Sequence, residues 1–176
     1  MQYTSKSIVI EYLELMIEKA ELVIQRNEYI LSYQDFLISP DRMEKFDAAC
    51  MLIQVIGETA KKIDDWTNKQ LFINYPEVYW HGVFGCRNII SHEYGNVEPE
   101  QIFGIIKKYL PELIICTKKI VEDIKNASEK LSLGAGQMSS SSQLVSSGAS
   151  EQAASTEEIS ATMEEMNAAI EETSAS

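Results

Sequence analysis

The sequence SPDRMEKFDAACMLIQVIGETAKKIDDW, residues 39–66, predicts the central helix of the fold. Ser39 is a candidate N-cap, and Pro40 suits the first helical position, where no backbone donor is required. Apolar residues recur at helical spacing on one face. The side chains that we expect to be buried on this face are Phe46, Cys50, Ile53 and either Ile56 or Gly57. Glycine inside a helix costs about 1 kcal/mol relative to alanine, so we expect that close packing against another helix requires Gly57.

Helical periodicity continues on both sides of this stretch and predicts three more helices. The first covers residues 5–27, another runs from near Pro76 to about residue 95, and the last starts near Pro99. Because proline lacks a backbone donor and clashes with the preceding turn, Pro111 should kink or divide the last helix. No stretch alternates with period two. The predicted fold class is therefore all-α, an up-and-down helical bundle.

The composition of the chain changes after residue 126. Residues 1–126 carry 19 acidic and 14 basic side chains, a net charge of −5, whereas residues 127–176 carry eight glutamates against Lys130, a net charge of −7. The second part is also rich in Ser, Ala and Gly. We expect a helical domain over 1–126 and a separate tail over 127–176. The total charge of −12 excludes a broad nucleic-acid-coating surface, but a small local RNA site fits the mildly acidic first part.

Cysteine usage and hydropathy indicate a cytoplasmic protein. Cys50, Cys86 and Cys116 are far apart and form no C-x-x-C pair, so we interpret them as reduced thiols that fill the core. The N-terminal segment has no basic region, and Glu11 and Glu14 interrupt its apolar run, which is not typical of a signal peptide. No run of about 18 uncharged apolar residues predicts a membrane-spanning helix. We expect no membrane association, bound metal or cofactor.

The sequence RNIISHEYG, residues 87–95, combines side chains that suit RNA cleavage. A metal-independent ribonuclease needs a base for the ribose 2′-hydroxyl, which histidine can supply, and a fixed cation for the phosphate, which arginine can supply. Asn88 and His92 are four residues apart and share a helix face, with Arg87 on its flank. Ile89 and Ile90 are expected to point into the bundle. Spacing alone leaves two interpretations open, a catalytic site or a surface arginine with a histidine that caps the helix.

Three blocks occur in a fixed order along the chain, namely VIGETAKK, YPEVYWHGVFGCRNIISHEYGNV and YLPEL. Together they resemble the HepT-like branch of the HEPN superfamily, which comprises small all-helical ribonuclease toxins, over roughly residues 8–115. The resemblance implies metal-independent RNA cleavage by Arg87 and His92, with Asn88 in support, where two protomers of a homodimer meet. It also implies that the antitoxin, a minimal nucleotidyltransferase, attaches AMP to Tyr94. This modification would add bulk and negative charge beside the site and exclude a phosphodiester.

Other residues of these blocks receive structural interpretations. Gly57, Glu58 and Trp80 are expected to serve packing and dimer contacts. His81 is interpreted as a partly exposed polar residue rather than as a second catalyst. A modest basic patch would arise if the central helix lies alongside the motif, and its members would be Arg42, Lys45, Lys61 and Lys62.

The tail keeps a heptad register with a weak first half, which predicts an amphipathic, coiled-coil-like helix that is stable only with a partner helix. A glutamate recurs every seven residues and forms a solvated stripe, at Glu151, Glu158, Glu165 and Glu172. With the segment SEQAASTEEISATMEEMNAAIEETSAS, residues 150–176, as its clearest part, the tail over roughly residues 130–176 resembles the first methylation helix of methyl-accepting chemotaxis proteins. This resemblance implies that Glu158 and Glu165 are methylation positions.

Three functions are therefore compatible with the sequence. The first is a ribonuclease toxin of a toxin-antitoxin system, with RNA as its substrate and the nucleotidyltransferase as its partner. The second is a non-catalytic HEPN module that binds a nucleotide or a partner protein. The third is a chemotaxis signalling fragment, whose tail would join a receptor bundle.

Overall fold

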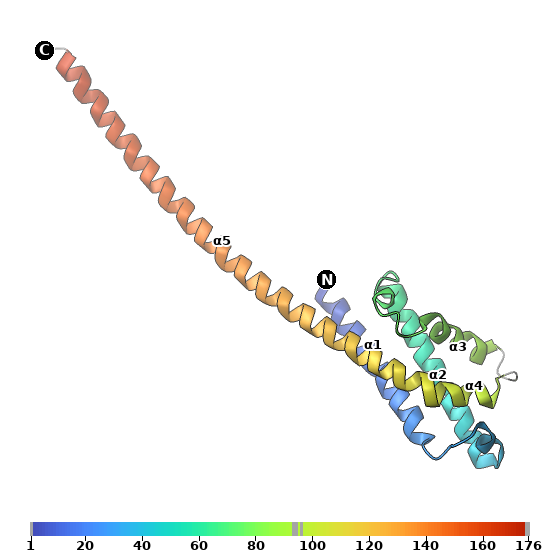
Figure 1. The fold of residues 1–176 in the computed structure, drawn as a ribbon. Helices are drawn as coiled ribbons and strands as arrows, with labels where there is room; N and C mark the ends of the chain where they lie inside the picture. The colour runs from blue at the N-terminus through green and yellow to red at the C-terminus, as the bar shows by residue number, and fades with distance from the viewer. Residues whose placement is uncertain (1, 93–94, 96, 175–176) are drawn as a thin grey trace. The chain divides into compact units, whose positions relative to one another are not determined.

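The computed structural model describes residues 2–92, 95 and 97–174 (Figure 1), with the side chains of all of these except 2–6, 92, 172 and 173. Every regular element in this part of the chain is helical, which confirms the predicted all-α class. The chain divides into two compact units, residues 1–126 and 127–176. Among the described residues, no helix is both long and apolar enough to cross a membrane.

The first unit is a helical bundle arranged around α2. Helix α2 packs against α1 and also against α3 (Figure 1). In chain order the elements are α1 (Gln2–Arg26), the 3-10 helix η1 (Tyr33–Leu37), α2 (Pro40–Trp66), the 3-10 helix η2 (Phe72–Asn74), α3 (Trp80–His92), α4 (Pro99–Gly104), the π-helix η4 (Ile105–Tyr109) and α5 (Leu110–Ser174), whose first part belongs to this unit.

Helix α2 begins as the sequence predicts. The Ser39 hydroxyl accepts a hydrogen bond from the backbone N–H of Arg42 at 3.4 Å, and Pro40 occupies the first turn. Burial of the predicted face is confirmed for Phe46, Cys50, Ile53, Ile56 and Gly57. Each large apolar side chain buried in this way contributes about 1.5–3 kcal/mol of transfer free energy. This core holds α2 between its two neighbours.

Helix α3 begins later than predicted, at Trp80 rather than near Pro76. The Trp80 ring stacks on Phe72 with a centroid distance of 3.9 Å, and its indole N–H donates to the Tyr75 carbonyl at 2.8 Å. These contacts fix the segment before Trp80 as a loop, so Pro76 lies outside the helix. The expectation for Ile89 is also wrong: this side chain is 46% exposed, whereas Ile90 is 5% exposed and buried as expected.

The predicted kink or division at Pro111 is replaced by a π-helical turn. Helix α4 leads through η4 directly into α5, and the Leu110 N–H bonds to the Ile105 carbonyl five residues earlier. Proline at position 111 cannot donate to the carbonyl four residues before it and would clash with it in a regular helix. The wider π-turn accommodates this defect, so the helix continues without ending.

Burial explains the expected state of the three cysteines. All three thiols are free, and Cys50 and Cys116 are buried. Burial disfavours the thiolate and raises the pKa of Cys50 to about 12, with a smaller contribution from the charge of Asp47. Burial also raises the pKa of Cys86. The structure thus agrees with the interpretation of the cysteines as core filler.

We predict that Cys50 resists alkylation in the native protein. At pH 8 its raised pKa leaves very little of the reactive thiolate, and its side chain has no exposed surface. Iodoacetamide labelling followed by peptide mass spectrometry should show slow modification of Cys50 in buffer and rapid modification in urea. Equal labelling rates in the two conditions would contradict the burial of this thiol.

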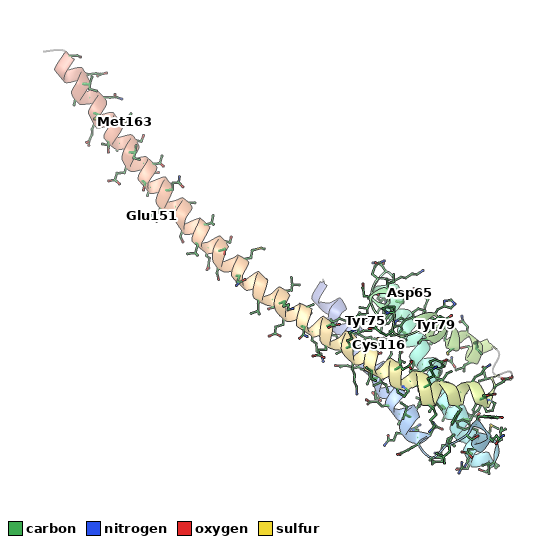
Figure 2. The ribbon with its side chains drawn as sticks, viewed as in Figure 1. Asp65, Tyr75, Tyr79, Cys116, Glu151 and Met163 are labelled. Carbon is green, nitrogen blue, oxygen red and sulfur yellow. The ribbon has the colours of Figure 1, made fainter. Side chains whose placement is uncertain are left out.

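The second unit is the C-terminal part of α5. From residue 129 to residue 171 every side chain is exposed, and Glu151 and Met163 illustrate this in Figure 2. The apolar members of the predicted heptad are 52% to 74% exposed, namely Leu131, Met138, Val145, Ile159, Met163, Met166 and Ile170. Glu158 and Glu165 are exposed on the same helix. Pairing of the tail with another helix and methylation of these two glutamates stay predictions.

We predict that a chain ending at Asn126 unfolds with nearly the same free energy as the full chain. The core lies in residues 1–126, and every side chain from residue 129 to residue 171 is exposed, so the deletion removes no core residue. Urea titration followed by tryptophan fluorescence measures this difference, because Trp66 and Trp80 both lie in the first unit. Loss of a cooperative transition in the shortened chain would show that the tail is needed for the fold.

Candidate functional site

Arg87 of α3 is held by an acidic side chain of α2. Its Nε donates to Glu58 Oε1 in a close ion pair, and its Nη1 donates to Asn88 Oδ1 at 3.3 Å. The Arg87 side chain is 42% exposed to solvent, and the Glu58 side chain is 34% exposed. Hydrogen bonds to a carboxylate are stronger than neutral ones. The guanidinium is therefore oriented by its neighbours while it remains accessible to solvent.

Gly57 lets the two helices approach closely enough for this pair to form. A Cβ atom at position 57 would lie 2.8 Å from the Val83 carbonyl oxygen and 3.1 Å from Arg87 Cβ. Both distances are shorter than ordinary van der Waals contacts. The prediction that close packing requires this glycine is confirmed. As a consequence, the next residue, Glu58, lies beside Arg87.

A hollow of about 170 Å³ adjoins Arg87 on the surface formed by α2 and α3. It is lined by Lys61, His81, Phe84, Gly85, Arg87 and Asn88. His81 and Asn88 are exposed, whereas Phe84 and Gly85 are half-buried. The hollow thus combines one aromatic ring, one imidazole, one amide and two cations.

The cations at the hollow are each paired with carboxylates. Lys61 forms ion pairs with Asp65 and with Asp64, the latter at 3.8 Å. The hydrogen bond to Asp65 is the main cause of a raised pKa for Lys61, so this lysine is charged at neutral pH. Glu58 balances Arg87, so these two cations face three carboxylates and the group carries one net negative charge.

The predicted basic patch does not form as a whole. Arg42 lies 19 residues before Lys61 on the same helix, which corresponds to about 28 Å along its axis. There the Arg42 guanidinium lies over the Tyr29 ring at 5.3 Å and near Asp35 at 3.9 Å. Arg42 and Lys45 therefore belong to the opposite end of α2. Of the four residues, Lys61 lines the hollow with Arg87.

The remaining residues of the motif lie at the end of α3. His92 is the last residue of this helix, and its side chain is outside the described part of the structure. His92 lies five positions after Arg87, about 7.5 Å of helical rise. Asn88 is one turn before His92 on the same face. The predicted modification site, Tyr94, lies outside the described residues.

Two features of the site were not recognised in the sequence. Glu58 was expected to serve packing and dimer contacts, but it binds Arg87. His81 was interpreted as a polar surface residue, and it lines the same hollow as Arg87. A signal existed for the second feature, because residues 81, 85, 88 and 92 follow helical spacing and share one face of α3.

A larger apolar groove of about 420 Å³ lies on the other side of α3. Residues from α2, the loop before α3, α3, η4 and α5 line it. They include Ile53, Tyr79, Val83, Tyr109 and Leu113. Tyr79, which is labelled in Figure 2, is 72% exposed, and Tyr109 is 53% exposed. The groove offers apolar surface but no charged cluster, so we do not assign cleavage chemistry to it.

Comparison with known proteins gives two matches. The family described as "Ribonuclease HepT-like" matches residues 16–120, more than half of the chain. The protein named "Putative RNase MJ0127" of Methanocaldococcus jannaschii is 32% identical over 78 residues, which cover 44% of this chain and 60% of that protein. This chain therefore aligns with less than two thirds of that relative. No solved structure matches the chain significantly. The family match includes Gly57, Glu58, Arg87 and His92 and excludes the tail.

Proposed function

Because the chain belongs to the HepT-like ribonuclease family, we propose that it cleaves RNA without a metal ion, with Arg87 and His92 as its catalytic residues. The observation that carries this proposal is the position of Arg87, whose guanidinium is oriented by Glu58 close to the end of α3 where His92 lies. A fixed cation beside a histidine supplies the two chemical functions that cleavage at a ribose phosphate needs.

In the proposed mechanism His92 takes the proton from the ribose 2′-hydroxyl. The 2′-oxygen then attacks the neighbouring phosphorus, and the bond from phosphorus to the 5′-oxygen breaks. The products are a 2′,3′-cyclic phosphate and a 5′-hydroxyl, whose oxygen takes one proton from solvent, and His92 then releases its proton to solvent. Arg87 binds the phosphate oxygens as negative charge develops on them, and Glu58 and Asn88 hold its orientation through Nε and Nη1. Preorganised donors of this kind supply much of the rate enhancement in enzymes.

We further propose that the active form is a homodimer with this site at the interface of its protomers. The resemblance to HepT-like toxins supports this assignment. The groove beside α3 adds apolar surface, with exposed tyrosines at 79 and 109. Sedimentation equilibrium of the full chain should give twice the monomer mass of 19.9 kDa. A monomer at micromolar concentration that still cleaves RNA would contradict the dimeric site.

The same resemblance supports a place in a toxin-antitoxin system. In this proposal a minimal nucleotidyltransferase is the antitoxin and transfers AMP from ATP to the Tyr94 hydroxyl, releasing pyrophosphate. The added phosphate would repel RNA next to His92. Intact-mass spectrometry after incubation with such an enzyme and ATP should show one added AMP in the wild type and none in Tyr94→Phe. Modification that persists in Tyr94→Phe would contradict this site.

The decisive assay for cleavage uses the purified full chain and a labelled single-stranded RNA in EDTA. We expect cleavage of RNA and no cleavage of the same sequence with 2′-O-methyl riboses, since methylation removes the attacking hydroxyl. Cleavage that requires an added divalent cation would contradict metal independence. Binding of RNA without cleavage under all conditions would favour the non-catalytic module instead.

A further inference from the structure

We propose that the hollow beside Arg87 binds a single unpaired nucleobase of the RNA, next to the bond that is cleaved. This inference rests on the proposed function, because it assumes that RNA lies across α3. It assigns a substrate-binding role to His81, Phe84 and Gly85, which the cleavage chemistry does not require. It also explains why a glycine stands in the middle of a helix at position 85.

Gly85 lines the hollow and adds no side chain to it. A Cβ atom at Gly85 would meet no other atom within 4 Å, in contrast to Gly57, where it would clash with α3. Packing within the described chain therefore does not require glycine at position 85. The open space measures about 170 Å³. Such a space suits one planar ring rather than an extended ligand.

The lining of the hollow suits a base better than a second phosphate. Lys61 is paired with Asp64 and Asp65, so a second phosphate bound to Lys61 would have to displace a carboxylate, and Arg87 is already used for the phosphate that is cleaved. A flat ring needs no such displacement. Proteins bind unstacked RNA bases on aromatic or histidine rings and on the planes of arginine guanidinium groups. Here the rings that line the hollow are those of Phe84 and His81.

The position of the hollow places this base beside the cleavage site rather than in it. Gly85 and Asn88 lie on the same face of α3 as His92, and Gly85 precedes His92 by seven residues, about 10 Å of helical rise. The phosphate that His92 and Arg87 act on therefore lies toward the C-terminal end of α3. Asn88 lies between Gly85 and His92 on α3, and its exposed amide can hydrogen-bond to the edge of the base.

The test fills the hollow and leaves Arg87 and His92 unsubstituted. Gly85→Leu places an aliphatic side chain in the open space. Gly104→Leu is the matched control, since Gly104 is also helical, also has open space around its Cβ, and lies outside the hollow. The probes are fluorescent 2′-O-methyl nonamers of uridine, of adenosine and of abasic ribose, which measure binding without cleavage. Far-UV circular dichroism and thermal melting verify that each variant is folded.

We expect the wild type to bind at least one base-bearing nonamer about tenfold or more tightly than the abasic one, as is typical of base stacking on a protein ring. Gly85→Leu should reduce this ratio to about twofold or less, whereas Gly104→Leu should retain it. His81→Ala removes an exposed ring and should also weaken the preference for base-bearing over abasic RNA. This second variant keeps the test valid if Gly85→Leu does not fold. Equal base preference in the wild type, Gly85→Leu and His81→Ala would overturn the inference.

Cleavage assays separate this inference from the proposed function. If the wild type cleaves RNA, Gly85→Leu should raise KM about tenfold while kcat at saturating RNA stays within about twofold. Normal cleavage with an unchanged KM in Gly85→Leu would overturn the base site and leave the ribonuclease intact. A third outcome is that the wild type cuts nothing but binds RNA in a base-dependent way, and that Gly85→Leu loses this binding. That result would support the base site and reject cleavage.

Discussion

Replacing Arg87 by alanine is expected to lower kcat for RNA cleavage by about 10²–10³-fold, the range found when one preorganised donor to a developing oxyanion is removed. The variant loses the cation that Glu58 orients toward the site. Arg87→Lys should recover only part of the rate, because an ammonium cannot reproduce the planar fork of a guanidinium. Initial rates at saturating RNA measure the effect on kcat.

Lys118→Ala is a suitable control for this series. Lys118 is an exposed cation on α5 that pairs with Glu21 at 2.7 Å, outside the hollow and the motif. Its removal changes the net charge of the chain as much as Arg87→Ala does. If both variants lose the same modest factor in rate, the effect of Arg87 is one of general charge and the proposed catalytic role is wrong.

Replacing Gly57 by leucine is expected to lower the free energy of unfolding by about 1–3 kcal/mol, the usual cost of overpacking a tight contact. The added Cβ would lie 2.8 Å from a backbone oxygen, that of Val83, which cannot move without shifting α3. The same shift would displace Arg87, whose Cβ is 3.1 Å from the new atom. We therefore expect a loss of cleavage activity together with the loss of stability.

Urea titration of Gly57→Leu beside Gly104→Leu measures this prediction. At position 104 a Cβ would meet no atom within 4 Å, so leucine there should leave the midpoint nearly unchanged or raise it slightly. An unchanged midpoint in Gly57→Leu would mean that α2 and α3 are not packed as closely as the structure shows.

Local sequence signals predicted much of the fold correctly. The start of α2 follows from Ser39 and Pro40, and its buried face follows from the spacing of Phe46, Cys50 and Ile53. The errors arise where distant contacts override local pattern. Stacking of Trp80 on Phe72 delays the start of α3, which a proline alone had suggested earlier. A π-turn absorbs the defect of a proline at position 111, which single-residue rules treat as a break.

The residue types of the candidate site follow from the sequence, and their catalytic roles stay predictions, whereas the contacts of these residues come from the structure. The motif itself gave Arg87, Asn88 and His92 from the sequence. The partner of Arg87, however, lies 29 residues earlier, and nothing local identifies Glu58 as that partner. The hollow is lined by Gly85 of α3 and also by Lys61 of α2. It can therefore be recognised only when the packing of these two helices is known.

The most direct test of the account is the rate of RNA cleavage in EDTA by the wild type and by His92→Ala, with analysis of the product ends. We predict that the wild type leaves a 2′,3′-cyclic phosphate and a 5′-hydroxyl, and that His92→Ala loses about 10²-fold or more of this activity, the typical contribution of a general base. Wild-type activity in His92→Ala, or products that carry a 5′-phosphate, would contradict cleavage by Arg87 and His92.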